Sequence, residues 1–134
     1  MSVRVPLSGV GVGYVILGIL GFAVGGFHDF VSDQGTKLVI LELTPFVNVV
    51  HLALGAALLR SAAHSEHDAR RAALGGGVVL AGLGLFGPLL EDVIAGGTGE
   101  HFLHVTTGAS ALALWGVSAR ATGRAQLARG DRSR

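Results

Sequence analysis

The sequence has no cysteine and few charged residues, and each absence narrows the kinds of protein it can be. Without cysteine, disulfides and thiolate metal sites are excluded. Charged residues occupy 14% of the 134 positions, against about 25% in soluble domains. Half of the residues are hydrophobic, which leaves too little polar surface to cover a water-soluble core. The composition therefore predicts a protein whose main partner is the lipid bilayer.

Four long apolar runs make up most of the chain. Each is close to the roughly 20 residues that a helix needs to cross a bilayer. Because lipid cannot hydrogen-bond the backbone, helices are the expected conformation of such runs. We therefore predict an all-α fold, a four-transmembrane-helix bundle in residues 1–119, followed by an arginine-rich cytoplasmic tail in residues 120–134. The predicted helices are Leu7–Phe27, Pro45–Ala63, Ala72–Leu90 and Gly99–Ala119.

Two of these runs begin with residues that start helices. Thr44 is a good N-cap and precedes a proline, Pro45, which suits the first helical position. Thr98 is the expected N-cap of the fourth helix, with Glu100 at its positive end. The first run is longer than the apolar core of a signal peptide, so we expect it to be retained as a helix.

The connecting segments alternate in charge. Cytoplasmic segments of membrane proteins are enriched in Lys and Arg, which predicts a multi-pass protein of the cytoplasmic (inner) membrane with both termini inside. Because the basic residues do not form a face of a folded domain, we expect no nucleic-acid partner. The predicted inner side has Arg4, then Arg60, Arg70 and Arg71, and finally Arg120, Arg124, Arg129, Arg132 and Arg134, whereas the outer loops have Asp29, Asp33, Lys37, Glu42, Glu91, Asp92 and Glu100.

The second and fourth runs share the motif H-x-x-x-G, with a further polar residue three positions before the histidine. The matching spacing predicts two similar helical hairpins, an internal repeat about an axis along the membrane normal. Polar groups are costly in lipid, so these faces should point into the bundle. The motif residues are Asn48, His51 and Gly55 in the second run and His101, His104 and Gly108 in the fourth.

Several roles for this polar intramembrane cluster remain open. Asn and His side chains can join helices by hydrogen bonds of about 1 kcal/mol each, with Gly55 and Gly108 allowing close helix packing. Alternatively, His51 and His104 could hold a haem iron as a cofactor site. A divalent metal near the outer surface, or a histidine pH sensor, are further alternatives. The candidate metal ligands are His101 and His104 with His28, Glu91, Asp92 or Glu100.

Nothing in the sequence combines a nucleophile with a base and an orienting group, so we do not expect an enzyme. We expect a structural or accessory membrane protein without a cofactor, which packs against itself or a larger membrane complex through small-residue faces. The glycine pairs Gly9/Gly13 and Gly21/Gly25 have the G-x-x-x-G spacing of such faces. A transporter is a more distant interpretation.

The two histidine segments also resemble a known family. The stretch "TPFVNVVHLALG" keeps Pro45, Asn48, His51 and Gly55 of its second-helix pattern, and "EHFLHVTTG" keeps Leu103, His104 and Gly108 of its fourth. The chain thus resembles the small four-helix membrane proteins, frequent in actinobacteria, of domain of unknown function 4383. The sequence departs from the family pattern at Thr44, where the family tends to have Asn, and at Val47, where it tends to have His. The resemblance implies the topology and no activity.

Overall fold

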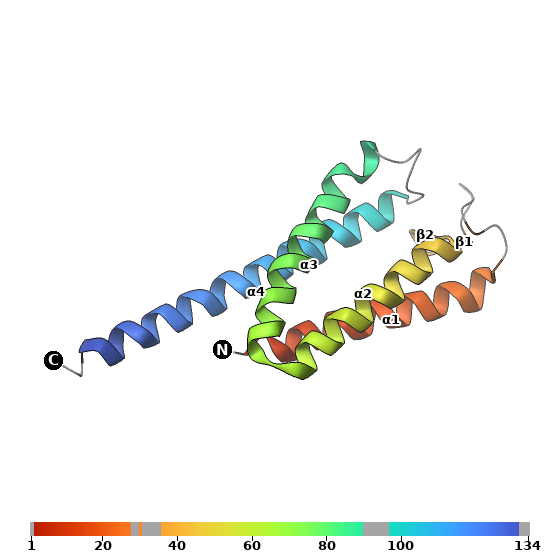
Figure 1. The fold of residues 1–134 in the computed structure, drawn as a ribbon. Coiled ribbons are helices and arrows are strands. Elements are labelled where there is room, and N and C mark those ends of the chain that lie inside the picture. The colour runs from red at the N-terminus through yellow and green to blue at the C-terminus, as the bar shows by residue number, and fades with distance from the viewer. Residues whose placement is uncertain (1, 28–29, 31–35, 90–96, 132–134) are drawn as a thin grey trace.

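The computed structural model describes residues 2–27, 30, 36–89 and 97–131. In them the chain forms the four expected helices (Figure 1). Each helix is long and apolar enough to cross a membrane, which confirms the predicted all-α bundle and supports a multi-pass membrane protein. The elements are α1 (Arg4–Gly25), β1 (Thr36–Leu38), β2 (Leu41–Leu43), α2 (Pro45–His64), α3 (Glu66–Phe86), the 3-10 turn η1 (Gly87–Leu89) and α4 (Thr98–Asp131).

The starts of α2 and α3 follow from capping side chains. Thr44 caps α2 as predicted, because its hydroxyl accepts a hydrogen bond of 3.2 Å from the Val47 amide. Ser65 caps α3 in the same way, accepting a hydrogen bond of 3.0 Å from the Asp68 amide. The predicted start of the third helix at Ala72 was therefore wrong, since the cap begins the helix earlier and makes its polar first turns helical.

Helix α4 differs from the prediction at both ends. Thr98 is its first residue and not its cap. The Gly97 amide donates a hydrogen bond of 2.9 Å to the Glu100 carboxylate. The helix therefore begins at Thr98, one residue earlier than predicted. At the other end, the helix does not stop at Ala119 but continues to Asp131, because the Ala- and Arg-rich sequence that follows has high helix propensity.

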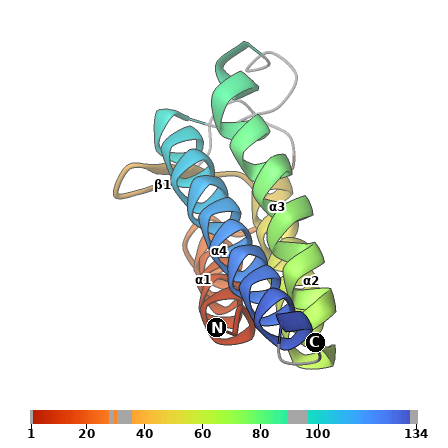
Figure 2. The same cartoon turned by 90° about the vertical axis from the view of Figure 1, so that its left-hand side faces the viewer.

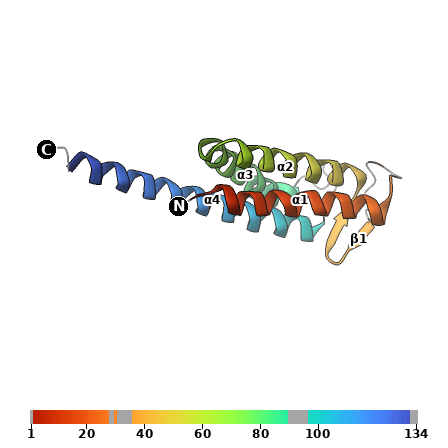
Figure 3. The ribbon, with the colours of Figure 1, turned by 90° about the horizontal axis from the view of Figure 1, so that it is seen from below.

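The helices form two antiparallel hairpins, α1 with α2 and α3 with α4. A single residue, Ser65, separates α2 from α3, and the two helices diverge from this turn (Figure 1). The N-terminus lies beside the turn (Figure 2), and the far end of α4 extends past both (Figure 3). We call the end with the turn the basic end, since Arg4, Arg60, Arg70 and Arg71 lie there.

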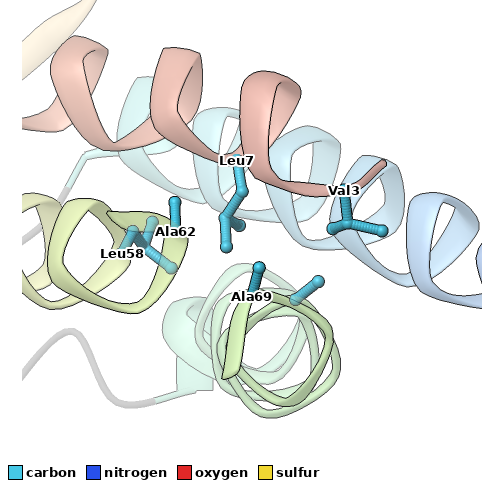
Figure 4. Close-up of a cluster of buried hydrophobic side chains, with 6 residues drawn as sticks. Val3, Leu7, Leu58, Ala62 and Ala69 are labelled. Atoms are coloured by element: carbon cyan, nitrogen blue, oxygen red, sulfur yellow. The ribbon is translucent and has the colours of Figure 1, made fainter. Parts of the chain in front are cut away.

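The basic end is closed by an apolar core and by polar contacts. Small side chains let α1, α2 and α3 converge around Leu7, which is 1% exposed (Figure 4). The Arg4 guanidinium donates to the carbonyls of Ala62 (2.6 Å) and Ala63 (3.0 Å), and so covers the C-terminal end of α2. Glu66 accepts hydrogen bonds from Ser2 and from the Val3 amide, both of 2.8 Å. The core residues are Val3, Leu7, Leu58, Ala62, Ala69 and Ala73.

At the opposite end, β1 and β2 form a short antiparallel hairpin that the sequence analysis did not predict. Lys37 pairs with Glu42 and Leu38 with Leu41 in its register. The turn residue Val39 has a φ of 60°, which β-branched residues rarely adopt. The sequence has no Asn-Gly or Asp-Gly at this turn to indicate a hairpin.

Candidate functional site between the two hairpins

Glycines bring the two helices of the first hairpin into backbone contact. A Cβ at Gly55 of α2 would lie 2.7 Å from the Gly11 carbonyl oxygen and 2.8 Å from the Val15 nitrogen of α1. A Cβ at Gly18 would lie 2.8 Å from the Asn48 carbonyl oxygen. No side chain larger than hydrogen fits these positions without moving a helix. Gly55 therefore lies where the backbones of α1 and α2 touch.

The second hairpin is joined by the same kind of contacts at matching residues. A Cβ at Gly108 of α4 would lie 2.8 Å from the Gly77 carbonyl oxygen of α3 and would also collide with Ala81. Gly84 of α3 lies against Val105 and the His101 carbonyl. Gly108 thus contacts α3 in the second hairpin as Gly55 contacts α1 in the first.

Asn48 and His101 also have equivalent places, and these are inside each hairpin. The Asn48 side chain lies directly over Gly21 of α1, in the space that a Cβ there would take. The His101 ring lies in the same way over Gly87, at the end of α3. Each of the two side chains therefore packs on a glycine of its own hairpin.

His51 and His104 meet between the hairpins, together with Tyr14 of α1. The two imidazole centroids are 5.9 Å apart, with an angle of 73° between the rings. The Tyr14 ring lies 5.3 Å from His51 and 6.4 Å from His104. The three rings form a triangle that links α1, α2 and α4. We call these three residues the ring cluster.

Within the ring cluster Tyr14 and His51 are buried and His104 is half-buried, and the polar atoms of Tyr14 and His51 have no hydrogen-bond partner among the described residues. His51 is 0% exposed, and neither of its ring nitrogens has a hydrogen-bond partner among the described residues. The same holds for both polar atoms of the Asn48 side chain. The Tyr14 hydroxyl faces Thr107 of α4 without reaching hydrogen-bond geometry.

The interhelical hydrogen bonds expected of Asn48 and His51 are therefore not formed within the described part of the chain. An unpaired buried polar group costs about 1–3 kcal/mol, so hydrogen bonding is not what stabilises the ring cluster here. Ring contacts join the hairpins instead, and an aromatic pair contributes about 0.5–1.5 kcal/mol beyond burial.

Tyr14 was not among the site residues predicted from the sequence. It is the only tyrosine of the chain and lies in an apolar helix. Its spacing indicates that it faces the other helices, because it lies three residues after Gly11 and four before Gly18, both of which pack on α2. A residue at these spacings shares the buried face of the helix. The corresponding position of the second hairpin has Leu80, which is 1% exposed.

A haem does not fit between His51 and His104 in this arrangement. A porphyrin extends on all sides of the line between its two axial imidazoles. The Tyr14 ring packs against both histidines and so occupies part of that space. A bare metal ion needs less room, and imidazole suits several first-row transition metals. The described residues contain no cluster of three or more His, Asp or Glu side chains placed to hold a metal.

Some of the predicted metal ligands cannot be placed. His28, Glu91 and Asp92 lie outside the described residues. Glu100 is 2% exposed at the start of α4, where it bonds to the Gly97 amide. The described members of the predicted outer site are thus Glu100, His101 and His104.

The comparisons with known proteins identify the family and nothing beyond it. No curated protein and no solved structure matches the chain. The family described as Domain of unknown function (DUF4383) matches residues 4–117, a range that includes α1, α2, α3, the first part of α4, the glycine contacts and the ring cluster. The chain belongs to this family.

Proposed function

We propose that the chain is an accessory membrane protein without enzymatic activity, and that it associates with a second copy of itself through α1. The observation that carries the proposal is that α1 has two glycine faces. Gly11, Gly18 and Gly21 pack against α2, whereas a Cβ at Gly9 or Gly13 would meet nothing within 4 Å. Gly9 and Gly13 have the spacing through which identical transmembrane helices pair closely.

Cysteine cross-linking tests the self-association directly, because the chain has no cysteine of its own. We expect the single variants Gly9→Cys and Gly13→Cys to form disulfide-linked dimers in membranes under mild oxidation. The control is Gly116→Cys on α4, whose position is equally open within one copy. If the two α1 variants form no more dimer than the control, the proposed interface is wrong.

We also propose that both termini face the cytoplasm across the inner membrane. The proposal is supported by the shared position of Arg4, Arg60, Arg70 and Arg71 at the basic end, since cytoplasmic ends are enriched in basic residues. In spheroplasts, an impermeant maleimide should label Lys37→Cys and spare His67→Cys until the cells are permeabilised. Labelling of His67→Cys in intact spheroplasts would reverse the orientation.

The two hairpins are proposed to be copies of one ancestral hairpin. Matching contacts support this origin: Leu52 packs on Gly18 in the first hairpin as Val105 packs on Gly84 in the second. If the positions are equivalent, the paired exchange Leu52→Val with Val105→Leu should change the unfolding free energy by less than about 1.5 kcal/mol, the usual limit for volume-conserving changes. A larger loss in detergent unfolding would contradict the equivalence.

A second candidate function is the binding of a transition-metal ion between His51 and His104. It is favoured by the two buried His51 nitrogens that have no partner among the described residues. Metal analysis of protein purified in mild detergent should then give a stoichiometric metal that both His51→Gln and His104→Gln remove. His64→Gln is the control, because that side chain is 80% exposed. A metal-free wild-type protein would end this candidate.

A further inference from the structure

The tip of the β1–β2 hairpin presents two large apolar side chains outside the protein. Val39 is 92% exposed and Ile40 is 64% exposed. Both are β-branched, and no described part of the chain covers them. Exposed apolar groups that adjoin one another mark a surface that contacts a partner or lipid.

The backbone at the tip is also unfavourable for the residue that occupies it. A φ of 60° at Val39 lies in the left-handed region, where glycine or asparagine is the residue that a water-exposed turn would use. Strained residues of this kind persist where something else compensates for the strain. An apolar environment around the Val39 side chain would supply that compensation.

The hairpin projects sideways from the bundle, across the direction of the helices (Figure 3). Its tip is held against the start of α4, where the Ile40 carbonyl lies directly over Gly99. One turn further along α4, Phe102 is 65% exposed on the outside of the bundle. The tip therefore continues the apolar outer surface of a helix long and apolar enough to span the membrane.

The charged residues of the hairpin lie behind its apolar tip. Lys37 and Glu42 form an ion pair of 3.1 Å across the two strands, and the Lys37 side chain is 75% exposed. Between the hairpin and α4 there is a hollow of about 490 Å³ with a mixed lining. Its walls are apolar at Val39, Ile40 and Phe102 and charged at Lys37 and Glu42. Such a lining suits the boundary between headgroups and acyl chains, where apolar groups enter lipid and lysine reaches phosphate.

We propose that the β1–β2 hairpin lies in the membrane interface, with Val39 and Ile40 inserted among the acyl chains and Lys37 at the level of the lipid headgroups. The partner of this surface is phospholipid. The inference requires that the helices span the bilayer, and it depends neither on which side faces the cytoplasm nor on the self-association through α1.

Spin labels at two neighbouring positions of the hairpin test the proposal. The single variants Val39→Cys and Lys37→Cys are labelled, and the protein is reconstituted into phosphatidylcholine bilayers. Collisions with oxygen, which concentrates in lipid, are compared with collisions with a nickel chelate, which stays in water. Both side chains are mostly exposed, Val39 to 92% and Lys37 to 75%, so Lys37→Cys is a matched control for what surrounds the tip.

We expect the oxygen-to-nickel ratio at position 39 to exceed that at position 37 several-fold. Equal ratios would place the tip in water and overturn the proposal. Low collision rates with both reagents at position 39 would mean that protein covers the tip, in this sample a second copy, and would overturn it too. Circular dichroism checks that the variants keep their helices, and Ile40→Cys repeats the measurement without changing the strained residue.

Discussion

Replacing Gly55 by alanine should destabilise the first hairpin, and the structure indicates by how much. The new Cβ would lie 2.7 Å from the Gly11 oxygen, where ordinary contact begins at 3.4 Å. The obstructing atoms include backbone on both sides, so α1 and α2 must move apart by about 0.7 Å. A gap of about 0.5–1 Å already forfeits a quarter to a half of each dispersion contact along the seam. Overpacking of this kind typically costs about 1–3 kcal/mol.

Reversible unfolding in mixed micelles, followed by circular dichroism, measures this change. Gly75→Ala is the control on the exposed side of α3, where an added Cβ meets nothing within 4 Å. Alanine is the better helix former by about 1 kcal/mol in water, so the control should be neutral or slightly stabilised. Gly108→Ala should repeat the loss in the second hairpin. If Gly55→Ala were as stable as Gly75→Ala, the close approach of α1 and α2 would be refuted.

Three further predictions concern the basic end and the ring cluster. Arg4→Ala removes two hydrogen bonds from the end of α2 and should cost about 1–3 kcal/mol of unfolding free energy, whereas Arg124→Ala, which removes an exposed side chain on α4, should cost little. Glu66→Gln should speed amide hydrogen exchange at Val3, whose amide donates to the carboxylate; unchanged exchange would show that this bond does not hold the N-terminus. Tyr14→Phe should unfold like the wild type, because it keeps the ring, while Tyr14→Leu should lose about 0.5–1.5 kcal/mol in the same unfolding assay; equal stability of the two would remove the role assigned to the ring contacts.

Apolar length and capping residues were enough to predict the four helices, because in lipid the backbone has few alternatives to helix. The start of α2 at Pro45 was predicted to the residue, since the Thr44 cap acts locally. The start of α3 was misplaced because hydropathy does not register a polar helical turn, although the Ser65 cap was readable in the sequence. The β1–β2 hairpin was missed because its turn has a β-branched residue where turn rules expect glycine.

For the candidate site, the repeated motif indicated which residues to compare between the hairpins but not which of them would meet. Helical periodicity places Asn48 and His51 on one face, yet it cannot say that Asn48 packs on Gly21 while His51 reaches His104. That difference depends on how the hairpins are placed against each other, which is a tertiary property. The side chains of Asn48 and His51 have no hydrogen-bond partner among the residues that the structure describes, and whether a partner lies at the right distance depends on the same placement.

The one-residue joint at Ser65 has a consequence for how the protein is made. Helix α1 packs mainly on α2, and α3 mainly on α4. The contacts within each pair therefore join residues that are close to one another in the sequence. Such local contacts form quickly, and the N-terminal part of a chain folds first during synthesis. The α1–α2 pair can therefore be inserted and closed while α4 is still being translated. The last step of assembly is then the docking of two hairpins that have already formed.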